Sequence, residues 1–264
     1  MVQIRFIIFF CLAILTILCP SSAVQAAEDE RIDQQTANGS KYEAKAYFDR
    51  AIQINPDDPK AWCEKGNALL GQERAREALE AFEKAIGRDW QSLEAWIGKG
   101  DSLMLQGRYD EALQAFDKAI EIDAGDAEPW LRKGYLLFSM GRWEDAIDAF
   151  DRAIKIEPQN AAGWSMKGNA LMELGRYDEA LLAFDKIIET HPQEREAWID
   201  RGLALLGLER YNESLEAFDR AIEVDQYDAA ADAEIWAMKG IALNKQGKYD
   251  EAVAAFDKSI DLDP

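Results

Sequence analysis

Small and apolar residues recur with helical spacing through most of this chain, in pairs of stripes separated by a short break. In one clear stretch, Trp164, Gly168 and Leu171 fall at i, i+4 and i+7, which is the spacing of one face of an α-helix. A second stripe begins at Ala180, and Gly175 lies between the two, where a helix is expected to break. Each such stretch therefore predicts two antiparallel helices joined by a short turn.

The same stretch occurs six times. Tryptophans mark it at positions 62, 96, 130, 164 and 198, each 34 residues after the last, and Trp236 follows after 38. Each tryptophan is followed by a glycine four residues later and a phenylalanine twenty residues later. The small residues allow the two helix backbones to approach closely. One hairpin has too few apolar side chains to offset the entropy lost on ordering, so neighbouring hairpins must stack.

This pattern resembles the tetratricopeptide repeat over residues 59–264. With tryptophan as position 4, the family's other marks fall in the second copy on Gly100, Leu103, Tyr109, Ala112, Phe116 and Ala119. The resemblance implies an all-α fold, an α-solenoid of antiparallel helix hairpins wound into a superhelix. Two features depart from the pattern. Position 7, often Leu in the family, is Lys or Arg in every copy, and the first copy has Glu73 and Ala75 where the pattern has Gly and an aromatic residue.

The repeats organise the chain into an array at 42–264, preceded by a polar linker at 27–41. The array opens with a half repeat at 42–58 that matches only the second helix, and full repeats follow at 59–92, 93–126, 127–160, 161–194, 195–228 and 233–264. Four extra residues before the last repeat lie in a helix-favouring segment, 229–234. We therefore expect its first helix to start one turn early, capped by Asp228 or a neighbour; a longer loop is the alternative.

Residues 1–26 are typical of a signal peptide. Arg5 precedes an apolar run of 13 residues at 6–18, and Val24 and Ala26 are small residues suited to cleavage after Ala26. The run is shorter than the roughly 20 residues that span a bilayer. An uncleaved signal anchor, holding the protein to the membrane by residues 6–19, is the alternative. Both interpretations place the repeats outside the cytoplasmic membrane, secreted or in the cell envelope.

The formal net charge of −20 disfavours negatively charged partners. A field of this sign repels nucleic-acid backbones and anionic lipid head groups. We therefore expect no nucleic acid, and contact with a membrane only through an uncleaved N-terminal segment. The charge favours a protein or peptide partner that is basic or amphipathic. Alternatively, the acidic residues only keep an elongated surface soluble.

The sequence contains no recognisable catalytic constellation. Its single histidine, His191, lies in a Thr-His-Pro turn, and no nucleophile with a base, phosphate-binding loop or zinc spacing is present. The aspartate clusters do not follow the order of a calcium loop. We therefore predict that the protein is not an enzyme and has no cofactor or metal. Cys63 is expected to pack as a small apolar residue, with a reactive thiol as the alternative.

The resemblance implies a concave groove lined by positions 2, 5, 9, 12 and 13 of each first helix. In the middle of the array these positions carry apolar, aromatic and methionine side chains, which mark partner surfaces when exposed. The candidate groove residues are Ile97, Asp101, Met104, Leu131, Tyr135, Phe138, Asn169, Met172, Ile199 and Leu203. The alternative is that position 12 is half-buried between helices, which leaves a smaller patch. Cys63 replaces the lysine of the family's carboxylate clamp, so binding of acidic chain ends is not expected.

We therefore predict a non-catalytic protein–protein interaction scaffold that holds a peptide or protein segment in the concave groove, outside the cytoplasmic membrane. The alternative is a self-assembling structural module joined through an uncapped C-terminal face. On that face, Val253, Phe256 and Ile260 are expected to be partly uncovered.

Overall fold

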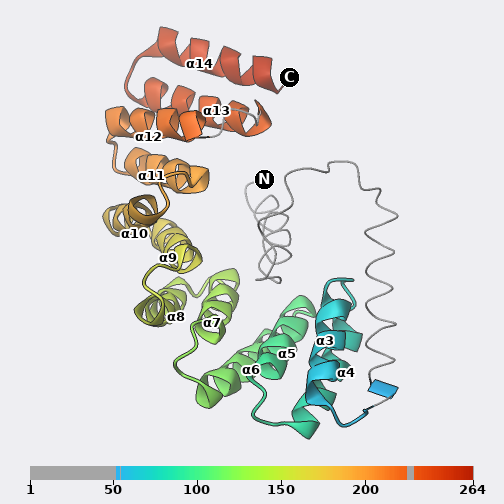
Figure 1. Ribbon diagram of the computed structural model, residues 1–264. Helices are drawn as coiled ribbons and strands as arrows, with labels where there is room; N and C mark the ends of the chain where they lie inside the picture. Colours follow the sequence, from blue (N-terminus) through green and yellow to red (C-terminus); the bar gives the residue numbers. More distant parts are fainter. Residues whose placement is uncertain (1–51, 54, 225–228, 264) are drawn as a thin grey trace. The chain divides into compact units, whose positions relative to one another are not determined.

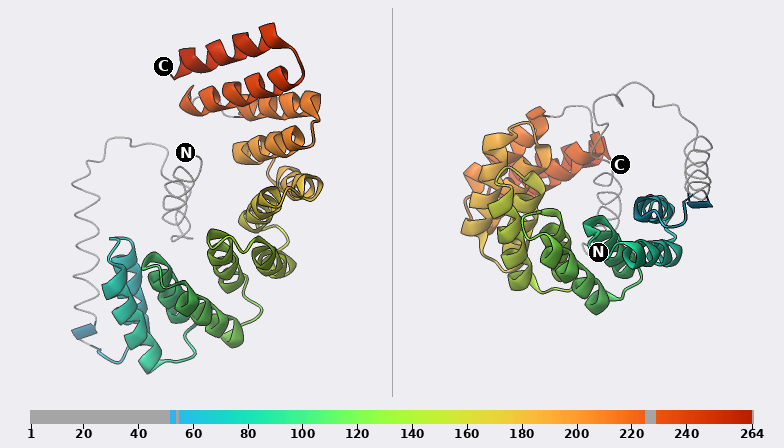
Figure 2. Two further views of the ribbon diagram at one scale, coloured as in Figure 1. Left: turned by 180° about the vertical axis from the view of Figure 1, so that it is seen from behind. Right: turned by 60° about the horizontal axis from the view of Figure 1, so that its bottom comes forward.

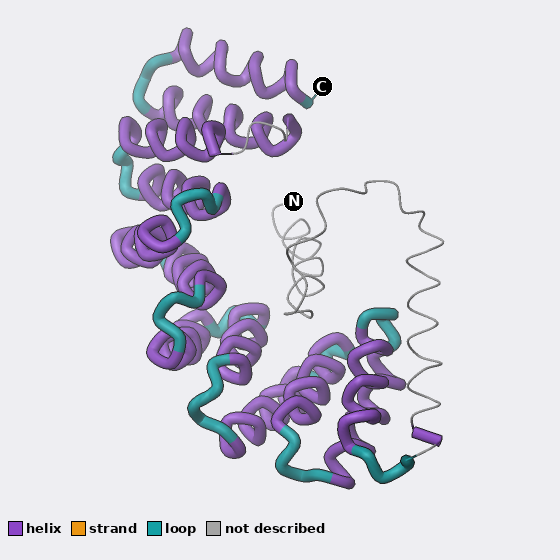
Figure 3. Tube along the Cα trace, viewed as in Figure 1, coloured by secondary structure: helices purple, strands orange, loops and turns teal. Residues whose placement is uncertain are grey.

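The computed structural model describes residues 52–53, 55–224 and 229–263. The described elements are all helices, joined by short loops (Figure 3). The predicted signal peptide, the linker, most of the half repeat's helix and the Asp228 cap lie outside the described residues. The all-α class predicted from the sequence is confirmed for the described part of the chain.

Twelve helices, α3 to α14, follow one another in the described ranges (Figure 1). The first helices of the hairpins are α3 (Pro59–Leu70), α5 (Leu93–Leu105), α7 (Glu128–Ser139), α9 (Ala161–Glu173), α11 (Arg195–Gly207) and α13 (Ala229–Lys245). The second helices are α4 (Ala75–Arg88), α6 (Tyr109–Ile122), α8 (Trp143–Ile156), α10 (Tyr177–Thr190), α12 (Tyr211–Val224) and α14 (Tyr249–Leu262). Each second helix follows its first helix after a short turn.

The chain divides into two compact units, residues 1–118 and residues 119–264. In the first unit, α3 packs on α4 and α4 packs on α5. In the second unit, successive helices from α7 to α14 pack one on the next (Figure 2). There α7 also touches α9, and α9 touches α11, whereas no comparable contact joins the described helices α8 and α10. In the second unit, α7, α9 and α11 are thus more closely spaced than the second helices beside them, and their free side is the inner side of this unit.

Glycine and phenylalanine hold each hairpin together. The five phenylalanine rings of α4, α6, α8, α10 and α12 are completely buried. In the fourth repeat, a Cβ added at Gly168 would lie 2.4 Å from Cε1 of Phe184. In the first unit, Phe82 is confined from two sides, because a Cβ at Gly98 of the next hairpin would lie only 2.3 Å from its ring. The glycines predicted to allow close helix approach therefore have that role.

In four of the six repeats, the repeated tryptophan connects the first helix to the loop before it. In four repeats the indole N–H donates a hydrogen bond to the backbone carbonyl six residues earlier: Trp62 to Pro56 at 2.9 Å, Trp96 to Trp90 at 2.8 Å, Trp164 to Pro158 at 2.9 Å and Trp198 to Pro192 at 3.0 Å. Trp90 replaces the proline without losing the bond, because any residue supplies the carbonyl. Nε1 of Trp130 is buried without a hydrogen-bond partner among the described residues.

The turn inside each hairpin uses one residue in the left-handed region. Four of these residues are glycines, with φ between 71° and 82°. In the first and fifth repeats the residues are Glu73, at φ 60°, and Glu209, at φ 59°. The turn of the first repeat therefore has the common conformation, although its sequence departs from the pattern.

The last first helix, α13, starts at Ala229, seven residues before Trp236, whereas α11 starts three residues before Trp198. The extra residues thus add one turn of helix, and the predicted early start is confirmed. In this extension the Asp232 carboxylate accepts a hydrogen bond from the Arg195 guanidinium at 2.5 Å, and both side chains are mostly buried. The extra turn is therefore fastened to α11.

Candidate partner-binding surface

The candidate groove residues all lie on first helices. Three of them, Ile97, Asp101 and Met104, are on α5 in the first unit. The others lie in the second unit, on α7, α9 and α11: Leu131, Tyr135, Phe138, Asn169, Met172, Ile199 and Leu203. The second unit thus carries most of the predicted surface, on these more closely spaced helices.

The aromatic and methionine residues of α7 and α9 are half-buried and pack against the core of the second unit. Phe138 and Met172 are half-buried and pack against the same core cluster, which includes Ile147 and Leu171. The Tyr135 ring meets the Phe150 ring edge to face, with centroids 6.2 Å apart and planes at 83°. Burial raises the pKa of the Tyr135 hydroxyl, so this side chain remains a neutral hydrogen-bonding group. The neighbouring first helices α7 and α9 therefore carry two half-buried apolar side chains and one hydroxyl.

Two predicted groove residues, Asp101 and Leu131, are buried and present little surface to a partner. Their exposed fractions are 5% and 7%. A Cβ at Gly163 of α9 would lie 3.4 Å from Cδ2 of Leu131, so the Leu131 side chain fills the space between α7 and α9. At Leu131, the spacing between α7 and α9 decides the burial, and the repeat pattern does not specify that spacing.

The surface continues along α11 toward α13. Ile199 and Leu203 are half-buried and pack against a core cluster that contains Phe218 and Ile235. Asn169 of α9 is also half-buried. Ile241 of α13, which follows Leu203 in the same series of positions, is exposed. The candidate set omitted Ile241, although counting four extra residues before the last repeat places it in that series.

Acidic groups also lie on the first helices α7 and α11 of the second unit. Oε1 of Glu128 accepts a hydrogen bond from Nε of Arg132 at 2.6 Å, one turn further along α7. On α11, burial raises the pKa of the Asp200 carboxyl to about 7, and the charge of Glu196 adds to this shift. Glu196 itself is exposed. Because burial favours the neutral form of Asp200, the exposed Glu196 is the acidic group of this pair that a cation approaching α11 would meet.

In the first unit, Cys63 is a packing residue. Its side chain is buried, with Sγ 3.8 Å from the Ser92 hydroxyl. Burial raises the pKa of the thiol to about 11, so little thiolate is present near neutral pH. The structure favours the packing interpretation over a reactive thiol. Nearby, Nδ2 of Asn67 donates a hydrogen bond to Oε1 of Glu94 at 2.9 Å, joining α3 to α5.

The basic residues at position 7 link neighbouring hairpins. Each lies near the tryptophan three residues earlier and, in four repeats, also pairs with an acidic residue on the preceding second helix. The pairs are Lys99–Glu83 at 3.0 Å, Lys167–Asp151 at 2.5 Å, Arg201–Asp185 at 2.8 Å and Lys239–Asp219. We call these pairs the inter-repeat bridges. The sequence showed this position only as a departure from the family.

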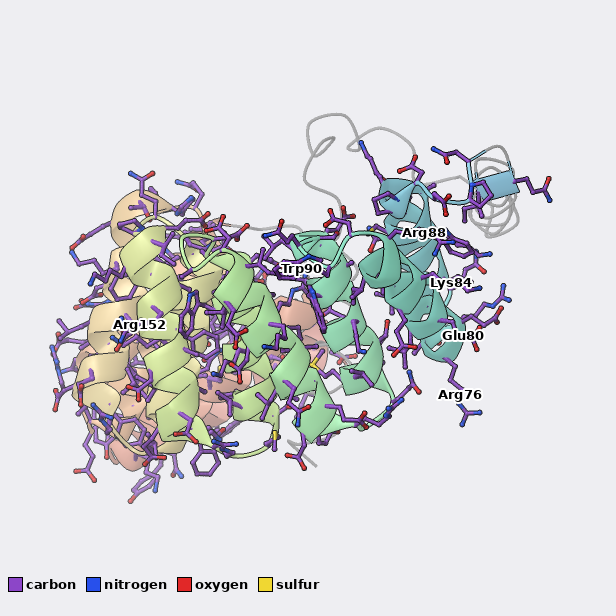
Figure 4. The ribbon with its side chains drawn as sticks, turned by 90° about the horizontal axis from the view of Figure 1, so that it is seen from below. Arg76, Glu80, Lys84, Arg88, Trp90 and Arg152 are labelled. Atoms are coloured by element: carbon purple, nitrogen blue, oxygen red, sulfur yellow. The ribbon has the colours of Figure 1, made fainter. Side chains whose placement is uncertain are left out.

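Cations also project from the outer sides of the second helices. Figure 4 shows Arg76, Glu80, Lys84 and Arg88 along one side of α4, and Arg152 on α8. Lys84 and Arg88 approach the Trp62 ring, at 4.6 and 5.2 Å from its centroid. Nε of Arg88 also donates to the Pro56 carbonyl at 2.5 Å. These two α4 cations therefore hold Trp62 and the preceding loop.

The described residues contain no cluster of His, Cys, Asp and Glu that could hold a metal ion. His191 is exposed at the end of α10, with Nδ1 2.8 Å from the Thr190 hydroxyl. Within the described ranges, no helix combines the length and apolar character needed to cross a membrane.

Models of the tetratricopeptide repeat match residues 36–58, 63–127, 103–170, 161–203 and 199–264 of the chain. No curated protein matches it. Among solved structures, the chain is similar to the C-terminal part of a TPR repeat-containing protein from Cytophaga hutchinsonii, with 17% identity and a TM-score of 0.71 over 86% of this chain and 92% of that one.

The chain is also similar to YrrB, described as a TPR protein with an unusual peptide-binding site, with 24% identity and a TM-score of 0.55 over 68% of this chain and 93% of that one. MamA has 24% identity and a TM-score of 0.59 over 66% of this chain and 95% of that one. At these identities the likeness shows the fold alone.

Proposed function

Because this chain belongs to the tetratricopeptide repeat family, we propose that it is a non-catalytic scaffold that binds a peptide or protein segment on the inner side of its first helices. The observation that carries this proposal is the set of side chains Tyr135, Phe138 and Met172 on α7 and α9. These side chains are half-buried, so they are held in place by the core and still present apolar surface. The described peptide-binding site of YrrB, a protein of the same fold, supports this use.

The partner that best fits this surface is basic or amphipathic. These half-buried apolar side chains favour a segment with one apolar side, and Glu128, Glu196 and the charge of −20 favour Lys or Arg beside it. Charge attraction of this kind mainly accelerates association. Association should therefore slow as salt rises from 50 to 500 mM, while dissociation changes less.

Photocrosslinking in the native host tests the surface without first identifying the partner. A benzophenone amino acid replaces Tyr135, keeping an aromatic ring at the site, and the matched control places the same group at Leu182. Leu182 is an exposed apolar residue on the second helix α10. We expect protein adducts from position 135 and few from position 182. Equal labelling at both positions, or none at 135, would contradict the proposal.

Alanine replacement then measures how much Tyr135 and Phe138 contribute to the free energy of binding. In the paired substitution Tyr135→Ala and Phe138→Ala, affinity for the crosslinked partner should fall at least about tenfold, since truncating central aromatic residues often costs more than 1 kcal/mol. Leu182→Ala should leave the affinity unchanged. Helical circular dichroism of both variants separates lost binding from lost folding.

We also propose that the repeats act outside the cytoplasmic membrane. This rests on the signal-like segment 1–26, which lies outside the described residues. Sequencing the N-terminus of the mature protein tests it. A start at Ala27 supports a cleaved signal, whereas a start at residue 1 in the membrane fraction supports an anchor through residues 6–19.

A further inference from the structure

Helix α14 lies at the end of the second unit (Figures 1 and 2). One side of this helix carries apolar residues that are largely exposed. Tyr249, Val253, Phe256 and Ile260 recur at i, i+4, i+7 and i+11, which places them on one side of the helix. Tyr249, Val253 and Ile260 have exposed fractions of 66%, 58% and 61%. Phe256 is half-buried, unlike its completely buried counterparts. We call these four residues the α14 stripe.

Two residues of other second helices that correspond to aliphatic positions of the α14 stripe are covered by the next first helix. Leu181 of α10 corresponds to Val253, and Ile154 of α8 corresponds to Ile260. Each of these two counterparts is only 8% exposed. Helix α10 packs against α11, and α8 packs against α9. The α14 stripe therefore has the residue pattern of a hairpin-to-hairpin interface, without a covering helix among the described residues.

The inter-repeat bridges define the charge that a covering helix brings. At each bridged interface, the covering helix places a Lys or Arg beside the acidic residue that follows the buried phenylalanine. On α14 this acidic residue is Asp257, which is exposed and pairs with no cation among the described residues. Asp250 and Asp261 lie on the same side of the helix, at i and i+11 relative to Asp257 at i+7. The stripe is thus bordered by negative charge.

We propose that the α14 stripe binds a partner helix that carries a Lys or Arg opposite Asp257 and an aromatic residue three positions earlier. The second requirement follows from the chain's own covering helices. Nζ of Lys167 lies 5.6 Å from the Trp164 ring centroid, and Nζ of Lys239 lies 4.0 Å from that of Trp236. Stacking of this kind holds the cation of the covering helix where it can pair with the acidic residue. This site is independent of the inner surface of the first helices.

A second copy of the chain fits the stripe less well. Two α14 helices packed on each other would bring together borders that both carry Asp250, Asp257 and Asp261. Such like-charge juxtaposition is unfavourable. The first helices α5, α9, α11 and α13 of a second copy are also occupied, since each packs on the second helix before it. A separate cationic helix is neither repelled by the aspartates nor already packed against another helix.

The test titrates the chain with a synthetic peptide of residues 159–176, which contains α9 with Trp164 and Lys167, and follows binding by fluorescence anisotropy. We expect saturable binding that weakens roughly tenfold or more in the variant Asp257→Lys, because attraction becomes repulsion. The matched control, Glu251→Lys, makes the same change of charge on α14. Glu251 lies beside Trp236 and Leu215, facing α12 and α13, so its variant should bind normally.

A charge exchange completes the test. The Lys167→Glu peptide should fail to bind the unaltered chain and should bind the Asp257→Lys chain. Absence of peptide binding at millimolar concentration, or equal binding by the unaltered and Asp257→Lys chains, overturns the proposal. Light scattering examines the second copy: a dimer that Val253→Asp abolishes and Asp257→Lys leaves intact also overturns it.

Discussion

At the scale of single residues, the turn inside each hairpin places one residue in the left-handed region. The conformational free energy of that residue is low in the four repeats that have glycine there and higher in the two that have glutamate. Glycine adopts this conformation freely, whereas a residue with a Cβ loses roughly 1–2 kcal/mol. Glu73 and Glu209 adopt it at φ 60° and 59°. The surrounding helix pairing therefore imposes the turn even where the residue opposes it.

We predict that Glu209→Gly stabilises the protein. Relief of the left-handed strain should outweigh the extra chain entropy of glycine in the unfolded state, for a net gain of about 0.5–1 kcal/mol. The matched change Glu216→Gly lies inside α12 and should cost about 1 kcal/mol. Urea denaturation of both variants checks the opposite signs. A loss of stability in Glu209→Gly would show that the glutamate makes compensating contacts.

Asp200 should make stability depend on pH. Its folded-state pKa of about 7 lies above the ordinary value of 3.8, so the folded state favours the protonated form. The resulting stability is fully present below pH 3.8 and is lost as pH rises through about 7. Asp200→Asn should therefore raise the melting temperature more at pH 8 than at pH 5. The exposed Asp148→Asn should show the same small effect at both pH values.

At the scale of helices, the inter-repeat bridges couple one hairpin to the next. A double-mutant cycle with Lys167→Ala and Asp151→Ala should give a coupling energy of about 0.5–1 kcal/mol, since both groups are partly shielded from water. The comparison pair Lys186–Glu189 lies within α10 and is more exposed, so its coupling should be smaller, about 0.2–0.5 kcal/mol. Chemical denaturation measures both. Zero coupling for the first pair would leave stacking on Trp164 as the role of Lys167.

The sequence predicts helices better than the contacts between them. Recurring tryptophan, glycine and phenylalanine were enough to predict the hairpins, because helical spacing and close packing are local requirements. The pairing of Lys167 with Asp151 spans 16 residues and two helices, outside the i, i+4 spacing that sequence patterns reveal. The acidic residue that follows each repeated phenylalanine could have predicted these inter-repeat bridges from the sequence. Burial of Leu131 was not predictable, because it depends on how closely α9 approaches α7.

At the scale of the molecule, successive hairpins are interchangeable. Deleting residues 161–194 removes one repeat and brings α11 to the place of α9 against α8. Trp198 then replaces Trp164, and Arg201 replaces Lys167 beside Asp151. We expect a folded, helical chain with a lower melting temperature, because repeats contact only their neighbours. Deleting 161–177 instead removes one helix and its turn, and should abolish cooperative unfolding by circular dichroism. Equal behaviour of the two deletions would contradict the repeat register.

The buried thiol at the start of the array supplies a native reporter. Cys63 is the only cysteine in the described part of the chain, and its neutral, enclosed sulfur resists alkylation while α3 remains packed against α4 and α5. The rate at which a maleimide alkylates Cys63 can be measured by mass spectrometry. This rate therefore reports how fast the first hairpin opens. Terminal melting becomes measurable without any engineered label.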